Sequence, residues 1–507
     1  MSTDVLLPPS PTPLQELFRH SYERPDAVAL IADGDVWTYQ RLAGEVVRLS
    51  NGLRRAGIRP GDRITLVVRP APVYALFLFA AMMTGSIAVS LKTELTAIEL
   101  NEFLHRQRPA LFIHDADLQD VVARMDPALL ERSRRFLSAG DGPDSWRQLL
   151  DDMDATEVPL PSDIDSPFLL LATSGTTGTP KLVAYSQRVV AHVTSALNAW
   201  QIDTDSCLIG STAVAHISGS LLLLVTIIKG CKEVMLARFN AETVLDVIEE
   251  HRGTAMFVAP FICMPLVEAQ QKRPRNISSL RVCGVGGDAC RPQVAQAFET
   301  TFKLQLGNTY GLTECIGSMV FGSDHASLRA VPGCARLVDG QGAEVVPGTV
   351  GELQMRGPNL SLGYWTGPGD IVSHTRDGWF ASGDLMQQDS NGDYRYVGRC
   401  KDLIISNTLN ISPIEVENQL IQHPSVADTA VAGAPDDESG QRVVAIVRLT
   451  ADADPTGAAD EILDWLRTRL ASFKLPERIV IATAIPRNAL GKIVRSEVVR
   501  IAIERYS

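Results

Sequence analysis

The chain has 507 residues, a length that fits about three domains, or one large domain with a smaller one. Hydrophobic residues make up 45% and charged residues 21%, which excludes a disordered or fibrous chain. The formal net charge of −12 argues against a general affinity for nucleic acid or anionic membranes, but it leaves room for a locally basic pocket around an anionic ligand.

Amphipathic helices and short apolar strands alternate through the first three hundred residues. Apolar residues recur at helical spacing from Leu42 to Leu53, and the pattern ends at Gly57, ahead of a strand-like run. This alternation predicts α/β layers with largely parallel sheets. The clearest predicted helices cover residues 39–53, 241–250 and 293–300, and the clearest strands cover residues 64–68, 169–171 and 281–285.

The pattern changes to a β-rich one beyond about residue 330. Asp339-Gly340 and Asn391-Gly392 are dipeptides typical of hairpin turns, and the second is followed by Tyr394 and Tyr396 at strand spacing. Residues 363–369 are interpreted as a glycine-rich loop.

The last hundred residues return to a compact α+β pattern. A helix is expected over residues 458–470 and a strand over residues 479–485. The predicted fold class is therefore α/β, with a large N-terminal body of layered α/β subdomains and a β-rich portion, followed by a small α+β C-terminal domain. The boundary is expected between residues 1–398 and residues 399–507.

Cysteine spacing and hydropathy bear on the cellular setting. The eight cysteines are scattered without a C-x-x-C pair, which predicts no zinc site or disulfide framework and favours a reducing compartment such as the cytoplasm. The first residues lack a basic stretch, so no signal peptide is predicted. The most apolar stretches, residues 74–83 and 221–228, are shorter than the ~18 residues of a membrane span and are expected to be buried helices or strands.

Residues 173–181 carry the strongest chemical signal, with the sequence TSGTTGTPK directly after an apolar run. Small residues let the backbone turn tightly and aim its N–H groups at one point, while hydroxyls add donors and a lysine adds positive charge. The stretch is not a Walker motif, because only two residues separate Gly178 from Lys181. It predicts a phosphate-binding loop, with an ordinary turn as the alternative.

Six motifs in order, beginning with this loop, resemble those of the adenylate-forming superfamily, which comprises acyl-CoA synthetases, adenylation domains of peptide synthetases and beetle luciferases. The resemblance spans most of the chain, so chance is a poor explanation. The five later segments are YGLTE at residues 310–314, a glycine-rich segment at residues 351–365, WFASGDL at residues 379–385, GRCKD at residues 398–402 and PRNALGKI at residues 486–493.

The resemblance implies a role for each matching residue. Glu314 would help to hold Mg²⁺, a hard cation suited to carboxylate and phosphate oxygens, Thr313 would contact the α-phosphate, and Lys492 would reach the carboxylate and α-phosphate region. Tyr310 would stack on adenine, and Asp384 and Arg399 would approach the ribose. The full set of residues expected to bind ATP is Thr173, Ser174, Gly175, Thr176, Thr177, Lys181, Gly287, Asp288, Asn308, Tyr310, Asp384 and Arg399.

Each of these residues also has a purely structural interpretation. Glu314 could be a solvated turn acid, Asp384 a cap at a strand end, Arg399 a member of a surface ion pair and Lys492 an exposed lysine. His216 lies where many relatives place a histidine or aromatic residue beside the acyl pocket, so it is a candidate catalytic or pocket residue, with a satisfied core histidine as the alternative.

The implied reaction has two steps. A carboxylate attacks the α-phosphate of ATP and expels pyrophosphate, and a second nucleophile then displaces AMP from the acyl-adenylate. The small C-terminal domain of the family rotates between these steps, with Lys401 at the pivot. The residues expected around the acid are mostly apolar, so an aryl or alkyl monocarboxylic acid is predicted. They are His216, residues 257–262 and 286–288, and those near Asn308 and Ile316.

The acceptor of the acyl group stays open between a thiol and an amine. CoA is the commonest acceptor in such sequences, but this chain has Thr408 where CoA-using relatives commonly have a glycine that lets pantetheine pass. An amide-bond synthetase of the coronafacate type is therefore the alternative, and a carrier protein is a further possible acceptor. A non-catalytic nucleotide-binding module is a remote alternative, and a dinucleotide-dependent oxidoreductase is disfavoured because the glycine fingerprint is not completed.

Overall fold

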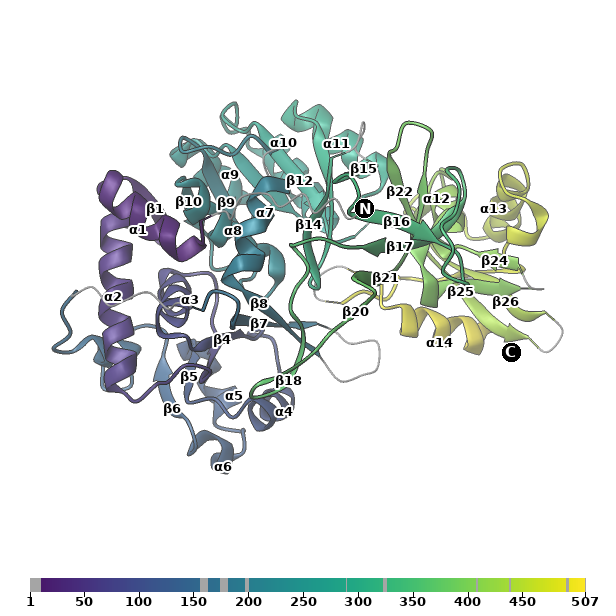
Figure 1. Ribbon diagram of the computed structural model, residues 1–507. Helices are drawn as coiled ribbons and strands as arrows, with labels where there is room; N and C mark the ends of the chain where they lie inside the picture. Colours follow the sequence, from purple (N-terminus) through teal and green to yellow (C-terminus); the bar gives the residue numbers. More distant parts are fainter. Residues whose placement is uncertain are drawn as a thin grey trace. The chain divides into compact units, whose positions relative to one another are not determined.

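The computed structural model describes residues 11–155, 163–173, 181–196, 200–288, 290–321, 326–406, 409–436, 439–488 and 492–506. The chain divides into two compact units, which are described separately (Figure 1). Unit 1 consists of residues 1–287, 294–321 and 356–380, and unit 2 consists of residues 288–293, 322–355 and 381–507.

Unit 1 contains an eight-stranded sheet in the order β19-β18-β8-β7-β4-β3-β5-β6. The five strands from β7 to β6 pair in parallel, whereas β8, β18 and β19 are added antiparallel. The strand bounds are β3 (Arg63–Val67), β4 (Ile87–Ser90), β5 (Leu111–His114), β6 (Arg134–Leu137), β7 (Pro167–Thr173), β8 (Lys181–Ser186), β18 (Gly363–Gly367) and β19 (Asp370–Val372).

A second sheet of unit 1 has the strand order β14-β13-β12-β11-β9-β10-β1-β2. Neighbouring strands from β13 to β1 are parallel. The two outer strands are antiparallel to their neighbours, β14 to β13 and β2 to β1. The bounds are β1 (Val28–Ala32), β2 (Asp35–Thr38), β9 (Cys207–Gly210), β10 (Lys232–Met235), β11 (Ala255–Val258), β12 (Val282–Gly286), β13 (Leu306–Leu312) and β14 (Cys315–Phe321).

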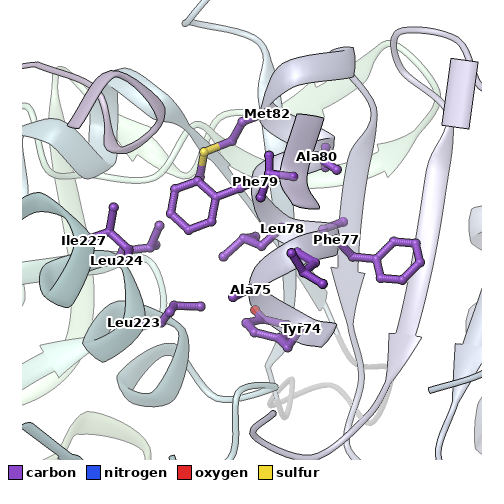
Figure 2. Close-up of a cluster of buried hydrophobic side chains, with 14 of the residues drawn as sticks. Tyr74, Ala75, Phe77, Leu78, Phe79, Ala80, Met82, Leu223, Leu224 and Ile227 are labelled. Atoms are coloured by element: carbon purple, nitrogen blue, oxygen red, sulfur yellow. The ribbon is translucent and has the colours of Figure 1, made fainter. Parts of the chain in front are cut away.

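Helices cover these sheets, and two of them form the centre of the apolar core. Helix α3 (Pro72–Thr84) is apolar all round and buried along almost its whole length, as expected for a helix with no polar face. Figure 2 shows Leu78 and Phe79 of α3 facing Leu223 and Ile227 of α8 (Ile217–Lys229). Both helices come from stretches that were expected to be buried, and no described helix is long and apolar enough to cross a membrane.

The remaining helices of unit 1 begin at recognisable caps. Thr38 caps α2, and Thr96 forms a capping box with Glu99 at α4. These helices are α1 (Pro13–Glu23), α2 (Tyr39–Arg55), α4 (Ala97–Gln107), α5 (Gln119–Val122), α6 (Pro127–Leu130), α7 (Gln187–Ala196), α9 (Ala241–His251), α10 (Pro260–Lys272) and α11 (Pro292–Phe302).

Unit 2 contains an antiparallel group of strands and a smaller α+β sheet. The first group runs β16-β17-β21-β22-β15, and the second runs β24-β23-β26-β25 with β27 beside β26. Segment 288–293 belongs to this unit, and Arg291 forms an ion pair of 2.8 Å with Asp428 of β25. The bounds are β15 (Ser327–Ala330), β16 (Ala335–Val338), β17 (Val350–Met355), β21 (Trp379–Gln388), β22 (Tyr394–Arg399), β23 (Ile404–Ser406), β24 (Leu409–Ile411), β25 (Val426–Asp436), β26 (Gly440–Leu449), β27 (Arg478–Ile481), α12 (Pro413–Leu420), α13 (Ala458–Arg467) and α14 (Arg495–Tyr506).

The predicted helices and the largely parallel sheets are confirmed, while the predicted glycine-rich loop at residues 363–369 is wrong. Most of that segment is strand β18, because Tyr364, Trp365 and Thr366 are good strand residues that pair with β8 on one side and β19 on the other. Only Pro368-Gly369 turns the chain. The predicted domain boundary after residue 398 is the position of a hinge, and a division of the chain into compact units does not test a hinge. The boundary stays a prediction.

Candidate active site

Strands β7 and β8 form a hairpin that presents Lys181 at the end of the predicted phosphate loop. Thr173 is the last residue of β7, and its Cα is paired with that of Lys181, the first residue of β8. The two ends of the loop are therefore held together by the sheet. Residues 174–180 lie outside the described residues, and they include four of the residues expected to bind ATP, namely Ser174, Gly175, Thr176 and Thr177.

Thr313 and Glu314 form the tight connection between β13 and β14. Leu312 and Cys315 are paired across the two strands, so these two polar residues are the whole turn. The backbone of Glu314 is fixed further, because its carbonyl accepts a hydrogen bond of 2.9 Å from the Ser361 N–H. The strand-to-turn geometry thus presents both side chains at the end of β13.

Asn308 and Tyr310 lie two residues apart on β13, so they share one face of that strand. The neighbouring strand β12 approaches closely, because Thr309 Oγ1 donates to the Val285 carbonyl at 3.0 Å. A Cβ at Gly286 would come within 2.2 Å of Thr309 Oγ1, and this close approach is the reason for a glycine there. Gly287 follows with a positive φ of 82°.

Tyr364 contacts both charged residues that were predicted in unit 1. Its hydroxyl donates to Glu314 Oε1 at 2.9 Å, and Lys181 Nζ lies 4.3 Å from the centre of its ring. Lys181 and Tyr364 are diagonal neighbours on β8 and β18, since the residue opposite Tyr364 is Val183. Burial and the adjacent Glu314 carboxylate raise the pKa of Tyr364, so the phenol remains a neutral donor.

His374 lies next to this group. Its Nε2 is 2.6 Å from Ser361 Oγ, and its ring packs edge-on against Tyr364 with centroids 5.5 Å apart. Burial lowers the pKa of His374, and the nearby Lys181 ammonium lowers it further, so the ring is neutral at neutral pH. The buried Nδ1 has no hydrogen-bond partner among the described residues.

His216 is the N-cap residue of α8. Its Nδ1 accepts a hydrogen bond of 3.3 Å from the Ser218 N–H and lies 2.7 Å from Ser218 Oγ. Accepting at Nδ1 places the proton of a neutral imidazole on Nε2. His216 is partly buried and caps a helix, so it is not the core histidine that was the alternative interpretation, and its predicted place beside the acid stays a prediction.

In unit 2, Asp384 and Arg399 are brought together as neighbours on β21 and β22. Their Cα atoms are paired across the strands, and Arg399 Nε lies 2.9 Å from Asp384 Oδ1. The Asp384 side chain is 2% exposed whereas that of Arg399 is 39% exposed. Burial raises the pKa of the adjacent Tyr396, and the charges of Asp384 and Asp288 raise it further, which puts Asp288 in the same neighbourhood.

The backbone of Lys492 is hydrogen-bonded to Asn488. The Asn488 N–H donates to the Lys492 carbonyl at 2.9 Å, and the Lys492 N–H donates to Asn488 Oδ1 at 3.0 Å. An isolated antiparallel bridge joins Arg487 and Ile493. The backbone of Lys492 is therefore fixed by its hydrogen bonds to Asn488 and by the adjacent bridge between Arg487 and Ile493.

The sequence analysis missed the roles of Ser361, Tyr364 and His374. Tyr364 was part of a recognised motif, but no chemistry was attached to it, because it was placed in a loop. Ser361 lies within the same glycine-rich segment without being one of its matching residues, and His374 lies outside every recognised motif. Pairing of β18 with β8 is what brings this segment to Lys181 and Glu314.

The donor set near Glu314 fits Mg²⁺ bound mainly through phosphates. No group of three or more His, Cys, Asp or Glu residues that could hold a metal occurs among the described residues. Mg²⁺ is usually bound by one or two carboxylates together with substrate phosphates and waters, so a single carboxylate near Lys181 of the predicted phosphate loop suits it.

Comparison with known proteins decides the family. The model for the AMP-binding enzyme matches residues 17–365, and the model for the AMP-binding enzyme C-terminal domain matches residues 415–492. The chain belongs to the AMP-binding enzyme family. It is an AMP-forming ligase, and the predicted superfamily and fold class are confirmed.

Members of this family that resemble the chain along nearly its whole length include both thioester-forming and amide-forming enzymes. A feruloyl-CoA synthase of an Amycolatopsis species is 33% identical over 95% of this chain and 97% of its own. The amide bond synthetase McbA of Marinactinospora thermotolerans is 26% identical, with a TM-score of 0.84 over 97% of this chain and all of its own. ATP-bound MatB of Rhodopseudomonas palustris shares the fold, with 24% identity and a TM-score of 0.89 over 98% of this chain and 100% of its own.

Proposed function

We propose that this enzyme activates an aryl or alkyl monocarboxylic acid with ATP and transfers the acyl group to CoA. The observation that carries the proposal is that Lys181 and Glu314 both contact Tyr364. This places the cation of the predicted phosphate loop near the carboxylate that is expected to bind the metal. The similarity to a feruloyl-CoA synthase supports an aromatic acid and CoA as the acceptor.

The first step brings two anions together, so the site must supply positive charge where negative charge builds. An oxygen of the acid attacks the α-phosphorus of ATP, and the bond to pyrophosphate breaks. Lys181 and Lys492 supply cationic donors, and Glu314 would hold Mg²⁺, which neutralises phosphate charge when bound. Thr313 would donate to the α-phosphate.

The residues assigned to the nucleoside are those that the family resemblance implies. Tyr310, Asn308 and Gly287 would border adenine, and Asp384 would accept hydrogen bonds from the ribose hydroxyls with Arg399 beside it. The pairing of Asp384 and Arg399 on adjacent strands supports this assignment. The enzyme is expected to act in the cytoplasm, as the cysteine pattern indicates.

An amide-forming reaction is the second candidate, favoured by two observations. The amide bond synthetase McbA is similar over almost the whole chain, and Thr408 replaces the glycine that commonly lines the pantetheine path. Thr408 lies outside the described residues. In either case the second nucleophile attacks the acyl carbon and AMP leaves with the bonding electrons.

Acid-dependent exchange between pyrophosphate and ATP tests the first half of the proposal. A panel of hydroxycinnamic, arylacetic, benzoic and medium-chain alkanoic acids is supplied with ATP and labelled pyrophosphate, and label is expected to enter ATP with one aromatic class. The best acid is then incubated with ATP and either CoA or a set of free amines. A thioester supports the main proposal, an amide supports the second candidate, and no exchange with any acid contradicts both.

A further inference from the structure

The side chains of Lys181 and Glu314 are oriented by the same residue. Among the described residues, the hydrogen bond to the Glu314 carboxylate comes from the Tyr364 hydroxyl, at 2.9 Å. The Lys181 ammonium lies over the face of the Tyr364 ring, with Nζ 4.3 Å from the ring centre. No ion pair joins the two charges to each other within the described part of the chain.

This arrangement keeps two opposite charges apart in a place where they could otherwise meet. An ammonium over an aromatic face is attracted by the ring without being neutralised, and a carboxylate that accepts one phenol hydrogen bond keeps its charge and its second oxygen. A direct ion pair would instead satisfy each charge with the other. Tyr364 thus leaves the cation available to phosphate and the carboxylate available to a metal.

Neighbouring residues hold Tyr364 in this position. Strand β18 is paired on both sides, to β8 through Val183 and to β19 through Val372. His374 packs edge-on against the ring, and its Nε2 lies within hydrogen-bond distance of Ser361 Oγ. The backbone N–H of Ser361 donates to the Glu314 carbonyl. The tyrosine is therefore preorganised by the fold before any ligand binds.

We propose that Tyr364 is a positioning residue of the adenylation site, which orients Glu314 through its hydroxyl and supports Lys181 with its ring so that the two do not pair. The inference rests on the proposed function, since it takes the metal and the phosphates as the groups that the two charges meet. Tyr364 acts through its neighbours and takes no part in bond making.

Two substitutions separate the two contacts. Tyr364→Phe removes the hydroxyl and keeps the ring, so the half-saturating Mg²⁺ concentration for exchange should rise by roughly tenfold, the worth of one hydrogen bond to a charged group, while KM for ATP changes little. Tyr364→Leu removes both contacts, so KM for ATP should rise as well, by about threefold or more, because Lys181 loses its aromatic support and can pair with Glu314.

Tyr185→Phe is the matched control. Tyr185 lies on the same strand as Lys181, is fully buried, and its hydroxyl has no hydrogen-bond partner among the described residues, although the Glu314 charge is close enough to raise its pKa together with burial. Losing that hydroxyl removes the same group from the same neighbourhood without cutting a hydrogen bond. The Mg²⁺ requirement of this variant should equal that of the wild type.

A double-mutant cycle with Glu314→Gln and an equilibrium measurement complete the test. If Tyr364 acts through Glu314, adding Tyr364→Phe to Glu314→Gln should change the Mg²⁺ requirement no further. Binding of Mn²⁺ in the presence of a non-hydrolysable ATP analogue, followed by electron paramagnetic resonance of the free ion, should weaken in Tyr364→Phe and not in Tyr185→Phe. Additive effects in the cycle, or unchanged Mn²⁺ binding, would overturn the inference.

The Mn²⁺ binding measurement also distinguishes a failure of this inference from a failure of the proposed function. Wild-type protein that binds Mn²⁺ with the ATP analogue but exchanges pyrophosphate with no acid would contradict the function, while the Tyr364→Phe and Tyr185→Phe comparison would still decide the role of Tyr364. Exchange in the wild type together with equal Mn²⁺ binding in both variants would contradict the role of Tyr364 alone.

Discussion

Lys492 is the residue on which the proposed chemistry depends most directly. Its backbone is hydrogen-bonded to Asn488, and the side chain is assigned to the forming bond between acid and α-phosphate. Lys492→Ala should lower the rate of acid-dependent exchange by on the order of 10²–10³, because one well-aimed donor to a developing charge is worth that much. The measurement is pyrophosphate exchange under saturating ATP and acid.

The matched control for that loss is Lys272→Ala, which removes an exposed lysine from the end of α10. It should leave exchange unchanged. Far-ultraviolet circular dichroism of both variants should match the wild type, so that a folding defect is not mistaken for lost chemistry. Near-normal exchange in Lys492→Ala would remove this lysine from the adenylation step.

The buried hydroxyl of Tyr185 is expected to lower the stability of the fold. Its hydroxyl is buried without a hydrogen-bond partner among the described residues, and such a group loses its hydration without compensation. Tyr185→Phe should therefore raise the free energy of unfolding by about 1 kcal/mol. Urea unfolding followed by tryptophan fluorescence measures the change, and a destabilised variant would mean that the hydroxyl has a partner in solution.

At the scale of elements, strand β10 carries a buried acid in the middle of a sheet. Glu233 is paired with Leu30 of β1 on one side and Leu208 of β9 on the other, and Thr226 Oγ1 donates to it at 3.3 Å. A Cβ at Gly210 would come within 2.2 Å of its carboxyl oxygen, so β9 has a glycine where this side chain lies. Burial raises the pKa of Glu233 from an ordinary 4.5 to about 8.

The raised pKa predicts how stability depends on pH. Between pH 4.5 and about 8 the native protein keeps a proton on Glu233 that the unfolded chain releases, so stability falls as pH rises through this window. Glu233→Gln removes the penalty and should stabilise the protein by on the order of a few kcal/mol at pH 8 but little near pH 4.5. Urea unfolding at several pH values compares the two proteins. A constant difference across the pH range would contradict a buried, titrating Glu233.

Strand β18 shows at the same scale how pairing partners override local composition. Its glycines, Gly363 and Gly367, favoured a loop when read locally, but the residues between them are strand formers that join β8 to β19. Gly363 is needed because a Cβ there would lie 2.4 Å from the Val372 carbonyl oxygen, and its φ is 129°. A glycine enforced by close approach of strands cannot be distinguished, within one sequence, from a glycine that permits a turn.

At the scale of the whole molecule, the proposed hinge lies at Lys401. This residue is in a single turn of 3₁₀-helix, Cys400–Asp402, between β22 and β23. Short segments at the ends of elements absorb the backbone rotation of a domain movement. Lys401→Pro fixes φ. If the C-terminal domain takes a different orientation in each step, as the family resemblance implies, this variant should slow one half-reaction by about tenfold or more while sparing the other.

Lys401→Ala provides the comparison, since alanine removes the side chain and leaves the backbone able to rotate. Exchange of pyrophosphate reports the first step, and transfer from purified acyl-adenylate to CoA or an amine reports the second. Equal losses in both steps for Lys401→Pro would argue against a hinge at this residue.

The sequence by itself determined the family, the order of the chemical motifs, the main helices and the largely parallel sheets. Periodicity sufficed for α2 and α9, because it depends on neighbours along the chain. The phosphate loop, which was inferred from a run of glycine, hydroxyl residues and lysine, stays a prediction. What only the tertiary structure decided was which distant side chains meet. The contact of Tyr364 with Lys181 and Glu314 and the burial of Glu233 arise from strand pairing between segments far apart in sequence, and one sequence contains no local signal for such pairing. The pair of Asp384 and Arg399 differs, because it joins the consecutive strands β21 and β22, and the hairpin turn between them was predicted from Asn391-Gly392.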